Sequence, residues 1–78
     1  MEYDADKVDD MILALMALNF FEDTFSTKTW KGFDWDSLNR LYEKKYISDP
    51  VGKAKSVTVT PEGLVRAKEL FEKYFGKK

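Results

Sequence analysis

The sequence predicts one small α+β domain whose elements follow in the order helix, loop, helix, β-hairpin, helix. Three observations predict it. Apolar residues recur at helical spacing in three segments, and two short β-like segments flank a turn that contains Pro and Gly before the last helix. The length of 78 residues suits a single domain with a thin core, so we expect residues 1–78 to fold as one unit.

The first helix should run from about Asp4 to Glu22. Carboxylates occupy its first turns, where the helix dipole favours negative charge. It carries two apolar stripes at helical spacing, which predicts burial on more than one side. The main stripe, expected to face the core, contains Val8, Met11, Ile12, Leu15, Met16 and Leu18. The second stripe, expected on the outside unless the following loop covers it, contains Leu13, Ala17 and Phe20.

The next segment, 23–32, favours no single period and is predicted to be a loop. A second helix then begins at Asp34, a good N-cap, and ends near Lys45. Trp35 should be a structural residue of the core, because large rings dominate small cores and it shares the apolar stripe of this helix. The stripe contains Trp35, Leu38, Leu41 and Tyr42.

A β-hairpin is expected after the second helix. Residues 46–48 form one short strand and residues 56–60 the other, joined by a turn that contains Pro and Gly. Val57 and Val59 should face the core, because they alternate with polar residues and a one-residue shift in register would expose both.

The last helix should begin at Thr60, whose side chain can cap it, with Pro61 in its first turn. Gly76 is its expected end. One apolar stripe at helical spacing predicts which side faces the core. This stripe contains Leu64, Ala67, Leu70, Phe71, Tyr74 and Phe75.

Bacterial winged-helix regulators resemble two stretches of this chain, LNRLYEKKYISDP (38–50) and KSVTVTPEGLVRAKELF (55–71). In those regulators a Leu-x-x-Leu segment ends the recognition helix, Tyr-Ile follows, and Leu-Thr-x-x-Gly opens the last helix after a wing hairpin. The resemblance implies a winged-helix-like domain whose wing is the expected hairpin. About ten residues separate the first two helices, which barely accommodates the additional helix of a helix-turn-helix.

Nearly the whole chain, from Asp6 onward, also resembles a family of short uncharacterised bacterial proteins that share a domain of unknown function. The resemblance rests on WKGFDW (30–35), ISDP (47–50) and KAKSV (53–57). It implies kinship and no biochemical activity.

Composition argues against an enzyme. The chain contains no Cys and no His, so disulfides are excluded and the commonest general base, the strongest nucleophile and the preferred zinc ligands are missing. Asp4, Asp6, Asp9 and Asp10 could hold a hard cation, but their spacing fits no calcium loop and is typical of a solvated first helical turn. We therefore expect no catalytic residue, metal, cofactor or small-molecule substrate.

Charge is distributed unevenly along the chain. The net charge is −1, but residues 1–27 carry −6, residues 28–55 carry +3 and residues 56–78 carry +2. The acidic first residues do not form a signal peptide, and the longest apolar run is too short to span a bilayer. We expect a cytoplasmic protein with no membrane partner.

Two function classes remain open. The first is a nucleic-acid-binding or regulator-like domain that binds weakly and salt-dependently, with phosphate contacts from Arg40, Lys44, Lys53 and Lys55. Alternatively, Asp36 pairs with Arg40 one helical turn away and the helix face is simply solvated.

The aromatic residues Trp30, Phe33 and Trp35 can stack on bases, although rings in a chain of this size more commonly fill the core.

The second function class is a protein-interaction module in which the wing is purely structural. Its expected form is a homodimer that joins through Leu13, Ala17 and Phe20.

Overall fold

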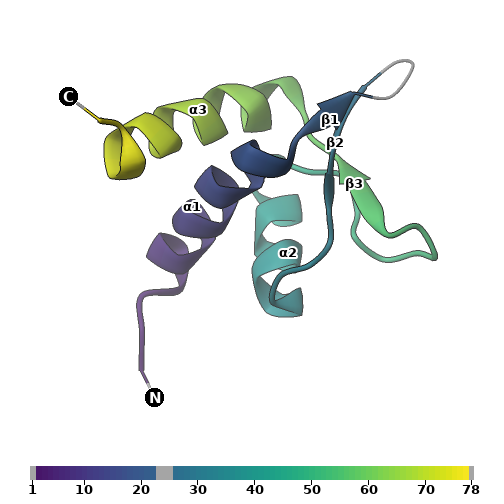
Figure 1. Ribbon diagram of the computed structural model, residues 1–78. Helices are drawn as coiled ribbons and strands as arrows, with labels where there is room; N and C mark the ends of the chain where they lie inside the picture. Colours follow the sequence, from purple (N-terminus) through teal and green to yellow (C-terminus); the bar gives the residue numbers. More distant parts are fainter. Residues whose placement is uncertain (1, 23–25, 78) are drawn as a thin grey trace.

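A computed structural model describes residues 2–22 and 26–77 of the chain. Within these residues it contains three α-helices and a three-stranded antiparallel sheet in the order β1-β2-β3, so the predicted α+β class is confirmed. The elements are α1 (Ala5–Met16), η1 (Ala17–Asn19), β1 (Phe21–Glu22), β2 (Thr27–Trp30), α2 (Trp35–Glu43), β3 (Ser56–Thr58) and α3 (Pro61–Phe75). Figure 1 shows α1 and α3 at one end of the molecule, the sheet at the other end and α2 between them.

The core lies where the three helices and the inner face of the sheet meet. Apolar side chains from each helix and from β3 are buried there, and their removal from water is the main stabilising term. The buried cluster consists of Leu13, Ala14, Met16, Leu38, Leu41, Ile47, Val57, Ala67 and Leu70. None of the helices in the described part of the chain is long and apolar enough to cross a membrane.

Helix α1 begins as predicted but ends earlier. The Asp4 carboxylate accepts a hydrogen bond from the Lys7 backbone N–H at 3.1 Å and caps the first turn. The α-helix stops at Met16, tightens into η1 and becomes extended at Phe20. The predicted end at Glu22 is therefore wrong, because the last residues obtain their backbone hydrogen bonds from β2.

The two apolar stripes of α1 both contribute to the core, so the predicted division between them is only partly right. Met16 and Ile12 of the main stripe lie in or against the core, as expected. Leu13 is fully buried, and Ala17 and Phe20 pack against the core. Leu15 and Leu18, which belong to the predicted core stripe, are exposed. Helices α2 and α3 both contact α1 and enclose the side that bears Leu13, a choice that periodicity alone does not specify. Leu13, Ala17 and Phe20 therefore do not form the outer surface that was expected to mediate self-association.

The segment predicted to be a loop contains the central strand of the sheet. Strand β2 pairs with β1 along one edge and with β3 along the other. Thr29 lies opposite Val57 on the core side, and Trp30 lies opposite Ser56 on the outer side. The Thr and Trp content of β2 favours β-structure, but so short a strand is stable only between partners.

The described residues between β1 and α2 contain no helix. Helix α2 is therefore not preceded by the additional helix that a helix-turn-helix requires. Figure 1 shows that the chain passes from β2 through a turn directly into α2. Residues 23–25 of the predicted loop lie outside the described part of the chain.

The two predicted hairpin segments, 46–48 and 56–60, lie side by side but form no regular two-stranded ladder. Ile47 and Val59 form an isolated bridge, and the Ser48 N–H donates to the Thr58 carbonyl oxygen at 2.8 Å. The main partner of β3 is β2 and not the segment that follows α2. Val57 and Val59 are both buried, which confirms their predicted orientation.

Helix α2 starts after Asp34, as predicted, and the Asp34 side chain caps its first turn at 3.2 Å. Leu38 and Leu41 are fully buried, whereas Trp35 is 49% exposed. The assignment of Trp35 to the core is therefore wrong. Trp35 is the first residue of the helix, and its ring lies at the margin of the apolar stripe because the centre of that stripe is Leu38 and Leu41.

Helix α3 starts in close contact with the turn that follows α2. The Thr60 hydroxyl accepts a hydrogen bond from the Gly63 N–H at 2.9 Å and donates to the Lys45 carbonyl oxygen at 2.7 Å. A Cβ at Gly63 would overlap the Tyr46 carbonyl oxygen, so the close approach requires glycine. The helix stops just before Gly76, as predicted.

We expect Gly63→Ala to lower the free energy of unfolding by about 1–3 kcal/mol, because the added methyl group displaces the backbone at Tyr46. The Tm of a domain of this size should fall by about 4–8 °C for each kcal/mol lost. Thermal unfolding followed by circular dichroism measures the change. Gly32→Ala is the matched control, since a Cβ there meets no atom within 4 Å. Equal Tm values for the two variants would contradict the close approach.

Candidate functional site

The four basic residues predicted to contact phosphates lie in two different environments. Arg40 and Lys44 are on α2 and its C-terminal cap, and they form ion pairs with α1. Lys53 and Lys55 are exposed in the 49–55 loop, which leads into β3. The structure therefore brings the first two together around carboxylates and leaves the last two facing solvent.

Arg40 forms a bidentate ion pair with Asp9 of α1. Arg40 Nε donates to Asp9 Oδ2 at 2.6 Å, and Arg40 Nη2 donates to Asp9 Oδ1 at 3.0 Å and to the Ser37 hydroxyl at 3.2 Å. Asp9 is fully buried. The predicted pairing of Arg40 with Asp36 is replaced, because a bidentate bond to a buried carboxylate is stronger than an exposed pair along one helix.

The surroundings of Asp9 favour its charged form. Burial of the carboxylate opposes ionisation, but hydrogen bonds from Arg40 and Ser37 and the charges of Arg40 and Lys44 outweigh it and lower the pKa of Asp9 below its ordinary value. The hydrogen bond to Asp9 in turn raises the pKa of Arg40. Both groups therefore remain charged at neutral pH.

The other carboxylates of the acidic first helix also face cations. Lys44 Nζ lies 3.0 Å from Asp6 Oδ1, and Arg66 Nη2 of α3 lies 4.0 Å from Asp10 Oδ2. Burial lowers the pKa of Lys44, but the hydrogen bond and charge of Asp6 outweigh this effect and raise it. Within the described residues no group of acidic side chains is arranged to hold a metal ion. The acidic segment serves as the counter-charge of α2 and α3.

The 49–55 loop is held against the end of β2. Lys31 Nζ donates to the carbonyl oxygens of Pro50 and Gly52, and the Lys31 N–H donates to the Lys55 carbonyl oxygen at 3.0 Å. Pro50 is buried. These contacts fix the path of the loop, so that Lys53 and Lys55 project from a defined position.

The outer face of the sheet carries an aromatic platform, formed by Phe21 and Trp30. The two rings stack with their centroids 4.8 Å apart and their planes inclined by 29°. Trp30 nevertheless remains 54% exposed. Lys28 lies on the same face of β2, two residues before Trp30. Trp30 lies opposite Ser56 of β3, and Lys55 is the residue that precedes Ser56.

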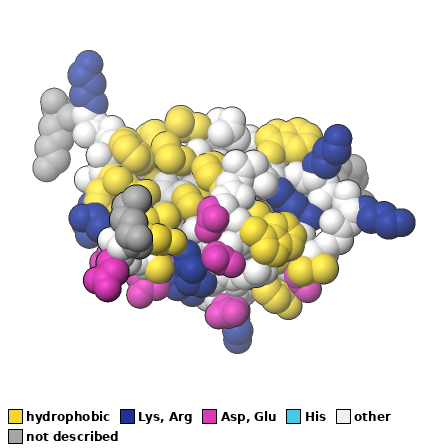
Figure 2. All heavy atoms as spheres, turned by 90° about the horizontal axis from the view of Figure 1, so that it is seen from below, with side chains coloured by type: hydrophobic (Ala, Val, Ile, Leu, Met, Phe, Trp, Pro, Cys, Tyr) yellow, Lys and Arg dark blue, Asp and Glu magenta, His cyan; other side chains and the backbone are white. Residues whose placement is uncertain are grey.

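Sequence reasoning identified Trp30 as a possible stacking residue and missed Phe21. Trp30 and Trp35 are both exposed, whereas Phe33 packs against the core. No sequence signal pointed to Phe21, because its contact with Trp30 depends on the pairing of β1 with β2. Figure 2 shows hydrophobic side chains spread over both halves of one face, with Lys or Arg side chains at several edges, among them the right-hand end, where the 49–55 loop lies in Figure 1.

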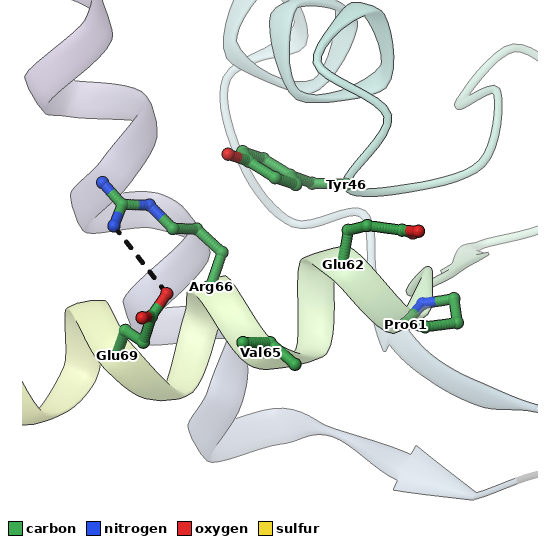
Figure 3. A pocket seen from close by; sticks show the side chains of 6 residues that line it. All are labelled: Tyr46, Pro61, Glu62, Val65, Arg66 and Glu69. Carbon is green, nitrogen blue, oxygen red and sulfur yellow. Dashed lines mark ion pairs between the residues drawn. The ribbon is translucent and has the colours of Figure 1, made fainter.

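A shallow groove of about 550 Å³ runs along the first half of α3. Figure 3 shows the residues that line it, which are Tyr46, Pro61, Glu62, Val65, Arg66 and Glu69. Arg66 lies 3.9 Å from Glu69, so its charge is partly offset within the groove. Two carboxylates against one guanidinium do not favour a phosphate, and we do not assign the groove to an anionic ligand.

We expect Asp9→Asn to destabilise the protein at pH 7, because it leaves the Arg40 guanidinium without its buried counter-charge. The pKa of Asp9 is lower in the folded state than in the unfolded state, so ionised Asp9 stabilises the folded protein in full above the ordinary pKa of 3.8. This stabilisation is lost as the pH falls through the lower pKa of the folded state. The difference between the urea midpoints of wild type and Asp9→Asn should therefore shrink below about pH 3.8.

Asp6→Asn is the control for this measurement. The Asp6 side chain is 81% exposed although it also pairs with Lys44, so its removal should change the midpoint little at either pH. A midpoint difference for Asp9→Asn that stays constant from pH 7 to pH 3 would show that the Asp9 charge does not stabilise the fold.

Comparison with known proteins places the chain among proteins without an assigned activity. The model of the DUF6429 family, a domain of unknown function, matches residues 4–77. An uncharacterised protein of Sinorhizobium fredii, y4hR, is 48% identical over 75 residues, which cover 96% of this chain and 97% of that protein. No solved structure matches the chain. The expected kinship with short uncharacterised bacterial proteins is confirmed, and the chain belongs to the DUF6429 family.

Proposed function

We propose that this protein is a non-catalytic, cytoplasmic nucleic-acid-binding domain that contacts phosphates through the 49–55 loop beside the outer face of the sheet. The observation that carries the proposal is the placement of Lys53 and Lys55. Both are exposed on a loop that Lys31 ties to the end of β2, the strand that carries the exposed ring of Trp30. Lysines held at a rigid edge are suited to phosphate oxygens.

The distribution of charge supports this surface. The carboxylates of α1 are offset by Arg40, Lys44 and Arg66, and α1 lies at the other end of the molecule from the 49–55 loop (Figure 1). The carboxylates of α1 therefore do not face the proposed ligand. The proposal assigns no phosphate contact to Arg40 or Lys44, because Asp9 and Asp6 already offset their charges.

The proposal does not depend on a helix-turn-helix. It rests on a loop and a sheet face, because lysine side chains contact phosphate oxygens without any need for a helix in a groove. The 49–55 loop occupies the place in the chain order where such a wing lies, between the second and third helices. Regulation through DNA is one role compatible with such a surface.

We expect salt-dependent binding that requires both loop lysines. Lys53→Ala combined with Lys55→Ala should weaken binding to a duplex of arbitrary sequence at low salt. It should also flatten the slope of log affinity against log salt by about two units, because each phosphate contact contributes about 0.9 to that slope. Fluorescence anisotropy of a labelled oligonucleotide over a series of salt concentrations measures both quantities.

The matched control is Lys68→Ala combined with Lys77→Ala, which removes two exposed lysines from α3 and the residue that follows its cap. The net charge changes equally in the two double variants, so only a local role of the loop can separate them. Equal slopes for the two variants would contradict the proposed surface. Binding of no nucleic acid at low salt would overturn the function itself.

A second candidate function, homodimerisation, is favoured by the outer stripe of α1. Val8, Met11, Leu15 and Leu18 recur at spacings of three, four and three residues, which is the seam spacing of paired helices. Leu18 is 67% exposed, and Val8 and Met11 line a depression of about 380 Å³. No charged residue lies between Asp10 and Glu22, so a two-fold axis could pair the part of the stripe from Met11 to Leu18 with itself without charge repulsion.

We expect Leu15→Glu to abolish any dimer while leaving the monomer folded, because the introduced charge would be buried at the seam and Leu15 is exposed in the single chain. Sedimentation velocity over a range of micromolar concentrations measures the oligomeric state. Val65→Glu is the control, since Val65 is an exposed apolar residue on α3. A wild-type protein that sediments as a monomer at every concentration would exclude this second function.

A further inference from the structure

We infer that the ligand of this surface is a single-stranded nucleic acid and that one of its bases stacks on Trp30. The inference rests on the proposed function and specifies its substrate class. It follows from the aromatic platform, the exposed lysines beside it and the way in which α2 is packed.

The aromatic platform holds the Trp30 ring in a fixed orientation. Trp30 lies on the central strand, where its backbone pairs with Ser56, and Phe21 on the neighbouring strand stacks on it at 4.8 Å. Because 54% of Trp30 is still exposed, the ring is presented to solvent while Phe21 supports it. A supported, exposed ring next to lysines is the arrangement with which proteins bind unpaired bases.

A flat ring on a sheet favours a single strand over a duplex. The bases of a duplex stack on one another and present only their edges, so a ring could reach a base face only by unstacking the helix. In a single strand the base faces are accessible, and the phosphates can follow the exposed lysines of the 49–55 loop.

Helix α2 offers no alternative way of entering a duplex groove. Its Arg40 is bound to Asp9, and the cap residue Lys44 is bound to Asp6, so these cations are directed toward α1. The exposed residues of α2 include Asp36 and Glu43, whose carboxylates repel phosphates. The chemistry of the surface therefore favours the sheet, and a base on Trp30, over a helix in a groove.

The chain contains a matched control in its second tryptophan. Trp35 is exposed to nearly the same extent as Trp30, 49% against 54%. Two carboxylates, Asp34 and Asp36, flank Trp35 in sequence. Trp30 instead has basic neighbours: Lys31 follows it, and Lys55 precedes its cross-strand partner Ser56. A non-specific contribution from an exposed ring should affect both tryptophans equally, but stacking at the proposed site should affect Trp30 alone.

Intrinsic fluorescence tests the contact without disturbing it. Trp35→Phe leaves Trp30 as the single tryptophan, and Trp30→Phe leaves Trp35. Titration with an oligothymidylate of about ten nucleotides should quench Trp30 emission to saturation and leave Trp35 emission nearly unchanged. An oligouridylate of the same length, titrated in parallel, determines whether DNA or RNA is preferred.

Affinity measurements give the energetic counterpart. Trp30→Leu should weaken binding of the single strand by about 5- to 100-fold, the range expected for the loss of one base–aromatic stack. Trp35→Leu should change it less than about twofold. For the wild type, a blunt duplex of the same length should bind more weakly than the single strand at equal salt. Circular dichroism tests whether each variant is folded. If Trp30→Leu is unfolded, the stacking inference is tested instead by the quenching of Trp30 in the Trp35→Phe variant, where Trp30 is intact.

The results separate this inference from the function on which it rests. Duplex binding at least as tight as single-strand binding, or equal effects of Trp30→Leu and Trp35→Leu, would overturn the stacking inference. If binding still required Lys53 and Lys55 in that case, the proposed function would stand. Binding of neither form at low salt would overturn both. Selective quenching of Trp30 by the single strand, with the duplex bound more weakly, is the expected result.

Discussion

The ion pair between Asp9 and Arg40 is the interaction on which the arrangement of this molecule depends. Asp9 is fully buried between α1 and α2, so its charge is tolerated only with the guanidinium in bidentate contact. This geometry holds α1 against α2, and α3 packs along the same helix. Leu13 then lies in the core, and Leu15 and Leu18 remain outside. The pair therefore joins α1 to α2 beside the core.

The same contact divides the charges of the chain into two regions. At one end, the acidic residues of α1 are offset by Arg40, Lys44 and Arg66, so these cations are part of the fold. At the other end, Lys53 and Lys55 project from the 49–55 loop. A chain with a net charge of −1 can thereby expose Lys53 and Lys55, because the carboxylates of α1 are offset by other cations.

Strand β2 gives the basic end its shape. It is the central strand, and its alternation turns Thr29 toward the core and Lys28 and Trp30 outward. Through Lys31 it also holds the 49–55 loop. The aromatic platform and the loop lysines are therefore positioned by one short strand, which links the stability of the sheet to the surface that we propose binds nucleic acid.

Local sequence signals by themselves determined the α+β class, the caps at Asp34 and Thr60, the start of each helix and the inward orientation of Val57 and Val59. Each of these depends on side chains a few residues apart, or on a period of two residues, which a single chain displays directly. The tertiary structure decided the rest. Periodicity shows that α1 has two apolar stripes, but only the positions of α2 and α3 decide that Leu13 and Met16 are buried and Leu15 is exposed. Strand β2, the Phe21–Trp30 stack and the pairing of Arg40 with Asp9 depend on partners distant in sequence, so the free energy that stabilises them is available only after the chain has folded.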